Sequence, residues 1–351
     1  MPTDIEFHLP FPAPRADSDQ HDRAARRGVD WAREFGLLEP TEKALRYFLG
    51  LRFADVATGF APDARGADLD VMTDLITWTA VCDDFFDGRA GDDPDLAART
   101  VAALTEVTRG GRPTTPATAL PAALRPLAAA TADLWNRSAA PMSEHWRARA
   151  GHGWRRFLRS FLAEAETRRQ GRVPGLTAYL ALRRETMAMY VYLDGVERAD
   201  RFELPARLLA DRYLRRMAEL QIDILAHCND VHSVEHEEAR GDTHNLVLVL
   251  ERRRGGPRAE VIREIQQRVR LLSEEFLAGA AGLDAHGTRL GCTPTERADL
   301  RRYIAAMARQ LRVTYDWSLA TVRYAAGPGR DLRPVYLSPA HPPAGPLPAR
   351  T

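Results

Sequence analysis

The sequence has 351 residues, of which 45% are hydrophobic, so it is long enough for one large domain or two small ones. Its 49 basic residues are balanced by 48 acidic residues, which argues against nucleic-acid binding as its main function. The three cysteines lie far apart, so neither a disulfide framework nor a CxxC metal site is expected. The N-terminus does not resemble a signal peptide, and no run of about 18 apolar residues suggests a membrane span, so we expect a soluble cytoplasmic protein.

The two ends of the chain differ in composition from the middle. Residues 1–17 contain several prolines and are expected to be extended, whereas residues 327–351 are rich in proline and glycine and are expected to form a flexible tail. Residues 18–326 are dominated by alanine, leucine, arginine and glutamate, which are good helix formers. They contain no alternating strand pattern of useful length and no internal repeat. The sequence therefore predicts a single all-α domain over residues 18–326.

Within this domain, apolar residues at helical spacing predict helices, in chain order, at residues 41–53, 68–86, 174–197, 205–241, 258–282 and 295–327. The helix at 68–86 follows Gly66 and has acidic residues in its first turn. This helix and the one at 174–197 are apolar on more than one face, which indicates positions inside a large helical bundle. Because unpaired buried charge is costly, polar clusters at the ends of such helices are candidates for function.

The helix at 68–86 leads into the acidic cluster Asp83, Asp84 and Asp87. Asp83 and Asp87 are spaced i, i+4, so their carboxylates lie on one helical face and repel each other unless a cation lies between them. Oxygen ligands without cysteine or histidine favour Mg²⁺ over zinc. The alternative is an exposed acidic helix end. It is less favoured because an aspartate at a C-terminus opposes the helix dipole and because the preceding dozen residues are mostly apolar.

A second polar cluster, NDVHSVEHE, covers residues 229–237. Asn229, Ser233 and Glu237 are spaced i, i+4, i+8 and form a stripe of oxygen-bearing side chains about 12 Å long on one helix. Such a stripe suits a hard divalent cation. His232 and His236 are also spaced i, i+4, so a zinc pair is an alternative, but no third ligand accompanies them. A solvated helix face without a ligand is the remaining interpretation.

Together, Asp83-Asp84-xx-Asp87 and Asn229-Asp230-xx-Ser233-xxx-Glu237 resemble the paired metal motifs of bacterial class I terpene synthases. Arg183 lies 46 residues before Asn229, the separation at which the family places an arginine that senses diphosphate, and Arg323-Tyr324 resembles the family's RY pair. The segment Gly241-Asp242-xx-Asn245-Leu246-Val247 is also similar to the family's sequence after the second motif. The similarity extends over residues 5–326. It implies a single-domain α-helical bundle with a central active-site cavity.

The resemblance also implies roles for individual residues. Three Mg²⁺ ions are expected, with the ligands Asp83, Asp84, Asp87, Asn229, Ser233 and Glu237. Arg183, Arg323 and Tyr324 are expected to donate hydrogen bonds to the diphosphate group of the substrate, a task that suits the planar arginine fork. Taken alone, Arg183 would more readily be interpreted as a surface ion pair with Glu185 or another neighbour.

Several positions depart from the family pattern. His236 stands where the family usually has a lysine, and Thr186 and Met187 stand where it often has an acidic residue and a small one. Thr79 and Ala80 precede the acidic cluster by one turn, where the family commonly has aromatic residues. Candidates for contact with the hydrocarbon chain and its carbocations are Trp78, Phe85, Phe86, Met187, Tyr190 and Trp317, although each of these side chains could equally belong to the core.

The sequence therefore predicts Mg²⁺-dependent ionisation and cyclisation of an isoprenyl diphosphate, with farnesyl diphosphate, a sesquiterpene product and release of diphosphate as the preferred interpretation. Geranylgeranyl diphosphate is the nearest alternative substrate. A chain-elongating prenyltransferase on the same fold is less favoured because it calls for a second aspartate-rich motif in place of residues 229–237. A non-catalytic helical binding module is the third alternative. A monomer or a homodimer is expected.

Overall fold

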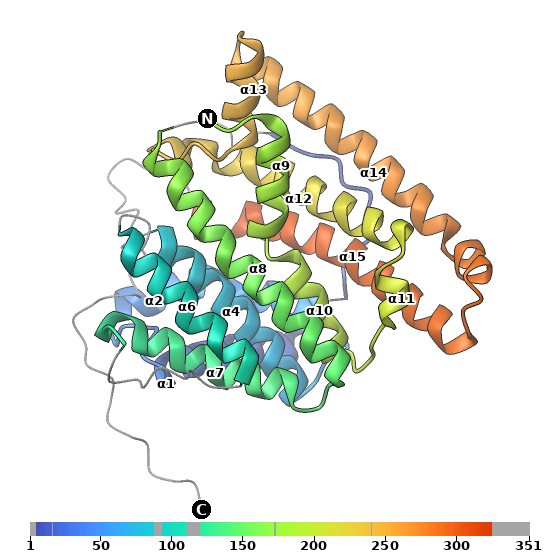
Figure 1. Cartoon of the computed structure of the whole chain (residues 1–351), viewed down its shortest axis with the longest axis horizontal. Helices are drawn as coiled ribbons and strands as arrows, with labels where there is room; N and C mark the ends of the chain where they lie inside the picture. Colours follow the sequence, from blue (N-terminus) through green and yellow to red (C-terminus); the bar gives the residue numbers. More distant parts are fainter. Residues whose placement is uncertain are drawn as a thin grey trace, which may run out of the picture.

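The computed structural model describes residues 5–15, 17–87, 93–110, 120–171, 173–239 and 241–324. Within these residues the chain is helical almost throughout and contains no β-strand, which confirms the predicted all-α fold (Figure 1). The predicted tail at residues 327–351 lies outside the described residues. No helix in the described part of the chain is both long and apolar enough to cross a membrane.

The α-helices are α1 (Ser18–Glu34), α2 (Glu42–Gly50), α3 (Phe53–Phe60), α4 (Ala67–Asp87), α6 (Pro94–Gly110), α7 (Arg125–Ala139), α8 (Glu144–Arg169), α9 (Leu176–Thr186), α10 (Met189–Ala199), α11 (Ala206–Leu209), α12 (Arg212–Ala239), α13 (Leu246–Arg254), α14 (Arg258–Arg289) and α15 (Pro294–Ala320). Two short 3₁₀ helices, η2 (Ala122–Leu124) and η3 (Val322–Tyr324), complete the described elements. The predicted helices at 68–86, 258–282 and 295–327 correspond to α4, α14 and α15.

Helix α4 lies in the interior of the bundle, as its apolar faces predict, and contacts α1, α3, α7, α8 and α10. Its buried Asp74 accepts hydrogen bonds from Arg27 on α1 and Arg137 on α7. This pairing satisfies a carboxylate that would otherwise be costly to bury. Because α4 is held along its length, the acidic cluster at its C-terminal end has a defined position.

Helix α12 is the second central element. It packs against α14 along its outer side and also contacts α9, α13 and α15 (Figure 1). Asn245 caps α13 by accepting a hydrogen bond from the backbone N–H of Val247 at 2.8 Å. The C-terminal parts of α4, α12 and α15 meet near the short helix η3, which contacts α12 and α15. This meeting point carries the motifs identified in the sequence.

Two of the predicted helices are divided in the structure. The helix expected at 174–197 is broken between α9 and α10, where Ala188 has a φ of 55° in the left-handed region. A non-glycine residue in this conformation carries backbone strain, so the break is held by the surrounding structure. The helix expected at 205–241 is divided into the short α11 and the long α12. The region predicted as residues 41–53 ends earlier, because Arg52 is also left-handed and starts a new helix, α3.

Residues 5–15 contain no regular secondary structure. The segment runs beside α14 toward the interior of the bundle (Figure 1). Its Phe7, Leu9 and Phe11 are buried in the core. The first helix begins at Ser18, next to the boundary expected from the sequence.

Candidate active site

One narrow pocket of about 90 Å³ brings together the side chains that the two motifs predict. Its walls come from α2, α4, α8, α9, α12, the loop after α12, and η3. The lining residues are Tyr47, Asp83, Asp84, Asp87, Glu164, Arg183, Asn229, Ser233, Glu237, Asp242, His244, Arg323 and Tyr324. All six predicted metal ligands and all three predicted diphosphate donors are in this set.

The α4 wall of the pocket is tied to η3 by one arginine. Arg323 is ion-paired with Asp83, and its Nη1 lies 2.8 Å from Oδ1 of Asp84. Burial acts to lower the pKa of Arg323, but the carboxylates of Asp84 and Asp83 raise it well above its ordinary value. The acidic cluster is therefore not an exposed helix end. Part of its negative charge is offset by the buried guanidinium of Arg323.

Asn229 links the α12 wall to Arg183 on α9 and to Tyr324 on η3. Nδ2 of Asn229 donates a hydrogen bond to the Tyr324 hydroxyl at 2.9 Å, and Oδ1 of Asn229 accepts one from Arg183. One turn later, the hydroxyl of Ser233 donates to the backbone carbonyl of Asn229 at 2.9 Å. The predicted stripe on α12 therefore faces the pocket, with Asn229 at the point where α9, α12 and η3 meet.

Glu237 completes this stripe one further turn along α12. Its Oε2 accepts a hydrogen bond of 2.8 Å from Nδ2 of Asn245. Desolvation raises the pKa of Glu237 to about 8, and the neighbouring carboxylate of Asp230 adds to the effect. A cation beside Glu237 would reverse this shift, because opposite charge favours the ionised form of a carboxyl group.

Asp230 is the main residue of the site that sequence reasoning did not assign. It is fully buried, lies 2.8 Å from Nη2 of Arg183, and accepts hydrogen bonds from the Tyr179 hydroxyl and, at 2.6 Å, from the backbone N–H of Leu246. It therefore orients Arg183, whose side chain is only 12% exposed. Glu185, the surface partner considered for Arg183, instead pairs with Arg156.

Four residues that line the pocket were also missed: Tyr47, Glu164, Asp242 and His244. Glu164 comes from the C-terminal part of α8 and lies 3.5 Å from Nδ1 of His244, and no motif surrounds it in the sequence. Asp242 did have a signal, because it belongs to the segment that follows the second motif. Its side-chain role could not be read from that position alone.

The donor set fits a hard divalent cation better than zinc. The predicted ligands on both walls are carboxylate, amide and hydroxyl oxygens, which suit Mg²⁺. His232 also does not support the zinc alternative, because its Nδ1 lies 3.0 Å from the hydroxyl of Ser318, on the side of α12 that faces α15. The His236 side chain lies outside the described part of the structure.

The six aromatic and methionine candidates do not line this pocket. Trp78 is fully buried, stacks on Trp154 with ring centroids 4.3 Å apart, and donates to the Thr131 hydroxyl at 2.8 Å. The ring of Tyr190 lies 5.6 Å from the guanidinium of Arg156. These contacts do not support the lining role expected for Trp78 and Tyr190. Both side chains make these contacts with residues that do not line the pocket.

The other candidates lie nearer to the site. Phe86 stacks on Phe161 with centroids 4.4 Å apart, and Phe85 lies edge-on to Phe86. Met187 is partly buried at the break between α9 and α10, next to Thr186, whose hydroxyl lies 3.4 Å from Nη1 of Arg183.

Trp317 lies edge-on to Tyr324, with ring centroids 5.9 Å apart. Its indole N–H donates to the backbone carbonyl of Leu51 at 2.6 Å. This hydrogen bond connects α15 to the turn after α2 and fixes the orientation of the indole. Of the aromatic candidates, Trp317 is therefore the one with a direct contact to the predicted diphosphate donors.

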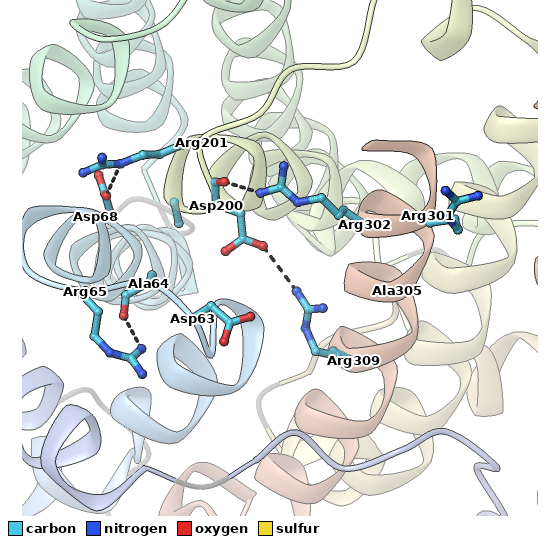
Figure 2. A pocket seen from close by; sticks show the side chains of 11 residues that line it. Asp63, Ala64, Arg65, Asp68, Asp200, Arg201, Arg301, Arg302, Ala305 and Arg309 are labelled. Atoms are coloured by element: carbon cyan, nitrogen blue, oxygen red, sulfur yellow. Dashed lines mark hydrogen bonds and ion pairs between the residues drawn. The ribbon is translucent and has the colours of Figure 1, made fainter. Parts of the chain in front are cut away.

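A larger cavity of about 650 Å³ lies between the N-terminal end of α4, the end of α10 and the first half of α15 (Figure 2). Its arginines are paired with aspartates: Arg201 with Asp68 at 2.7 Å, and Arg309 with Asp200 at 3.5 Å (Figure 2). Asp68 lies near the opposite end of α4 from Asp83, about 22 Å away along the helix. Because its arginines are already ion-paired with aspartates and no motif residue lines it, this cavity is not the candidate active site.

Comparison with known proteins gives the same assignment as the pocket. Residues 74–273 match the family model described as terpene synthase family 2, C-terminal metal binding. The chain belongs to the terpene synthase family. The resemblance inferred from the two motifs is thereby confirmed, and the protein is a class I terpene synthase that depends on a divalent metal.

Individual relatives cover nearly the whole chain. Pentalenene synthase from Streptomyces exfoliatus is 33% identical over 328 residues, which span 93% of this chain and 94% of that protein. The (−)-β-caryophyllene synthase of Saccharothrix espanaensis is 34% identical over 339 residues, covering 96% and 92%. The solved structure of linalool/nerolidol synthase from Streptomyces clavuligerus superimposes with a TM-score of 0.76 at 30% identity, covering 90% of this chain and all of that one.

Proposed function

We propose that this enzyme converts farnesyl diphosphate into a cyclic sesquiterpene and releases diphosphate, with Mg²⁺ as its metal. The observation that carries the proposal is the single pocket in which the α4 carboxylates and the α12 stripe face Arg183, Arg323 and Tyr324. An oxygen-only donor set opposite a group of strong hydrogen-bond donors suits a metal-bound diphosphate. The number of metal ions, three, stays a prediction from the resemblance.

The predicted ligands divide between the two walls. Asp83, Asp84 and Asp87 would hold metal on the α4 side, and Asn229, Ser233 and Glu237 would hold it on the α12 side. Bound Mg²⁺ supplies Lewis acidity that favours departure of the diphosphate. Charge balance supports the assignment, since the desolvated Glu237 and the clustered aspartates both require positive charge nearby.

Arg323 and Arg183 would exchange partners when substrate binds. Arg323 now pairs with Asp83 and Asp84, and Arg183 donates to Asn229. Transfer of these donors to diphosphate oxygens would leave the carboxylate and amide oxygens available for metal. Arg183 keeps its contact with the buried Asp230 in this step, so its guanidinium stays oriented toward the pocket.

After ionisation, the chain's own residues must exclude water from the carbocation. The buried aromatic residues beside the pocket supply apolar surface, and the face of Trp317 can stabilise positive charge by about 1 to 2 kcal/mol. Tyr324 connects these two functions, because its hydroxyl accepts from Asn229 while its ring lies against Trp317.

The choice of farnesyl diphosphate is supported by the relatives. The caryophyllene synthase is named for cyclising (2E,6E)-farnesyl diphosphate. Geranylgeranyl diphosphate is the alternative with a longer chain, and the linalool/nerolidol synthase of the same fold is named for acyclic alcohols. A monomeric or homodimeric state and a cytoplasmic location stay predictions from the sequence.

The test is incubation of the purified enzyme with Mg²⁺ and geranyl, farnesyl or geranylgeranyl diphosphate in separate reactions, followed by gas chromatography with mass detection. We expect cyclic C15 hydrocarbons or alcohols from farnesyl diphosphate as the main products. A larger kcat/KM for either of the other two substrates would overturn the chain-length assignment. Glu237→Gln is the control, because it keeps the shape of the side chain and removes its charge.

A further inference from the structure

The N-terminal residues 5–11 form an extended strap with one buried face. Phe7, Leu9 and Phe11 are 5%, 4% and 5% exposed, whereas the intervening Glu6, His8 and Pro10 are exposed. This alternation has the period of an extended chain, although the strap pairs with no strand in the described structure. Three buried apolar side chains in seven residues indicate a specific docking position on the bundle.

The first half of the strap contacts α12, which carries the stripe of pocket residues, and α15, which leads into η3 with its pocket residues Arg323 and Tyr324. The backbone N–H of Phe7 donates to the hydroxyl of Tyr315 on α15 at 2.8 Å. The Phe7 ring lies edge-on to the ring of His232 on α12, with centroids 5.9 Å apart, and to that of Tyr315 at 6.2 Å. Phe7 therefore fills the angle between α12 and α15.

His232 continues this connection toward the pocket. Its Nδ1 lies 3.0 Å from the hydroxyl of Ser318, which joins α12 to α15 directly. On α12, His232 immediately precedes Ser233. On α15, Ser318 immediately follows Trp317. It lies near the end of α15, shortly before η3, which carries Arg323 and Tyr324. A shift of either helix at this contact would displace Asn229 from Tyr324, which are now 2.9 Å apart.

We propose that Phe7 and His232 are positioning residues that hold α12 and α15 in register, so that the α12 stripe and the Arg323–Tyr324 pair face the same pocket. This inference rests on the site proposed above. It also accounts for a histidine that the sequence left without a role. His232 acts behind the stripe, by fixing the helix that carries Asn229, Ser233 and Glu237, and does not itself touch metal or substrate.

The second half of the strap provides a matched control. Phe11 lies edge-on to Phe276 on α14, with ring centroids 5.5 Å apart. Helix α14 contributes no residue to the pocket. Phe7→Ala and Phe11→Ala therefore delete the same side chain at the same 5% exposure, but only Phe7→Ala loosens α12 against α15.

The experiment compares these two variants in the full-length enzyme. Thermal unfolding is measured with a fixed concentration of inorganic diphosphate and increasing MgCl₂, and kcat and KM are measured with farnesyl diphosphate. We expect both variants to lower the melting temperature of the free protein to a similar extent. Only Phe7→Ala should raise the MgCl₂ concentration for half-maximal stabilisation, by about tenfold or more, and reduce kcat by a similar factor, as is typical when a supporting contact behind metal ligands is removed.

A second pair of variants tests His232. His232→Asn keeps a polar group near the position of Nδ1 and can retain the hydrogen bond to Ser318, whereas His232→Leu keeps the packing against Phe7 and removes that bond. We expect His232→Asn to retain most of the diphosphate-dependent stabilisation and His232→Leu to lose it. Equal behaviour of the two would contradict the positioning role.

The outcomes separate this inference from the proposed function. Glu237→Gln should abolish stabilisation by diphosphate and MgCl₂ while leaving the free protein folded. If it does so, but Phe7→Ala responds like Phe11→Ala, the strap only stabilises the fold and the inference is wrong. If wild-type protein shows no such stabilisation, the proposed metal site fails, and equal kcat values for Phe7→Ala and Phe11→Ala would then refute the strap as well.

Discussion

Replacement of Asp230 by asparagine is expected to damage both stability and catalysis, because this buried carboxylate supports Arg183. Asp230 is fully buried, lies 2.8 Å from the Arg183 guanidinium, and also accepts hydrogen bonds from Tyr179 and Leu246. Breaking a buried ion pair by neutralising one partner costs about 3 to 5 kcal/mol. Asparagine keeps one acceptor oxygen, so we expect a loss near the lower value, about 3 kcal/mol in the free energy of unfolding.

The catalytic loss should exceed what this destabilisation explains. Without the Asp230 charge, Arg183 loses the ion pair that orients it and can rotate away from the pocket. We expect kcat/KM to fall by at least about a hundredfold, which corresponds to roughly 2.7 kcal/mol in transition-state stabilisation. The assay is steady-state turnover of farnesyl diphosphate at a temperature at which circular dichroism shows the variant to be folded.

Asp74→Asn is the matched control for this prediction. Asp74 is equally buried and binds the two arginines Arg27 and Arg137 at 2.5 Å and 2.7 Å, but it lies in the middle of α4 away from the pocket. It should lose a similar amount of stability and keep near-normal kcat/KM while folded. If Asp230→Asn also keeps normal kcat/KM, or if both variants lose activity equally, the orienting role of Asp230 is refuted.

The remaining predictions concern metal, diphosphate and the carbocation. Chelation should abolish turnover and Mg²⁺ should restore it, whereas restoration by Zn²⁺ alone would contradict the oxygen donor set. Asp83→Asn and Glu237→Gln should each reduce kcat/KM by at least about a hundredfold, and near-normal turnover of either would remove that residue from the ligand set. Arg183→Ala should form little of any product. Trp317→Ala should stay active but release more acyclic or early-quenched product, because a change of about 1.4 kcal/mol alters a product ratio tenfold; an unchanged profile by gas chromatography would rule out its role.

Local patterns in the sequence were sufficient for the all-α fold and for both walls of the pocket, but they did not single out α1, α6, α7, α8 or α13. Helical periodicity depends on residues three and four positions apart, so the faces of α4 and α12 could be read without knowing their neighbours. The i, i+4 spacing of Asp83 and Asp87 and the stripe from Asn229 to Glu237 follow from the same geometry. Their order and separation, together with Arg183, were enough to recognise the family.

Breaks within helices could not be read in this way. Residues 174–197 are all compatible with one helix, and neither glycine nor proline marks the left-handed Ala188 that separates α9 from α10. Such a conformation is unfavourable locally and persists only because distant elements hold the two helices apart. The residues around Ala188 in the sequence therefore give no sign of this tertiary support.

The direction that each side chain faces was likewise decided by tertiary packing. Trp78 and Trp317 are both aromatic residues close to a motif, yet Trp78 stacks on Trp154 in the core and Trp317 contacts Tyr324 at the pocket. Asp230 and His232 lie inside the second motif, but their partners come from α9, α13 and α15 and from the N-terminal strap. The sequence by itself determined which residues can share a helical face. Only the tertiary structure decided which residues each face contacts, because buried charges and aromatic rings are stabilised by partners that are distant along the chain.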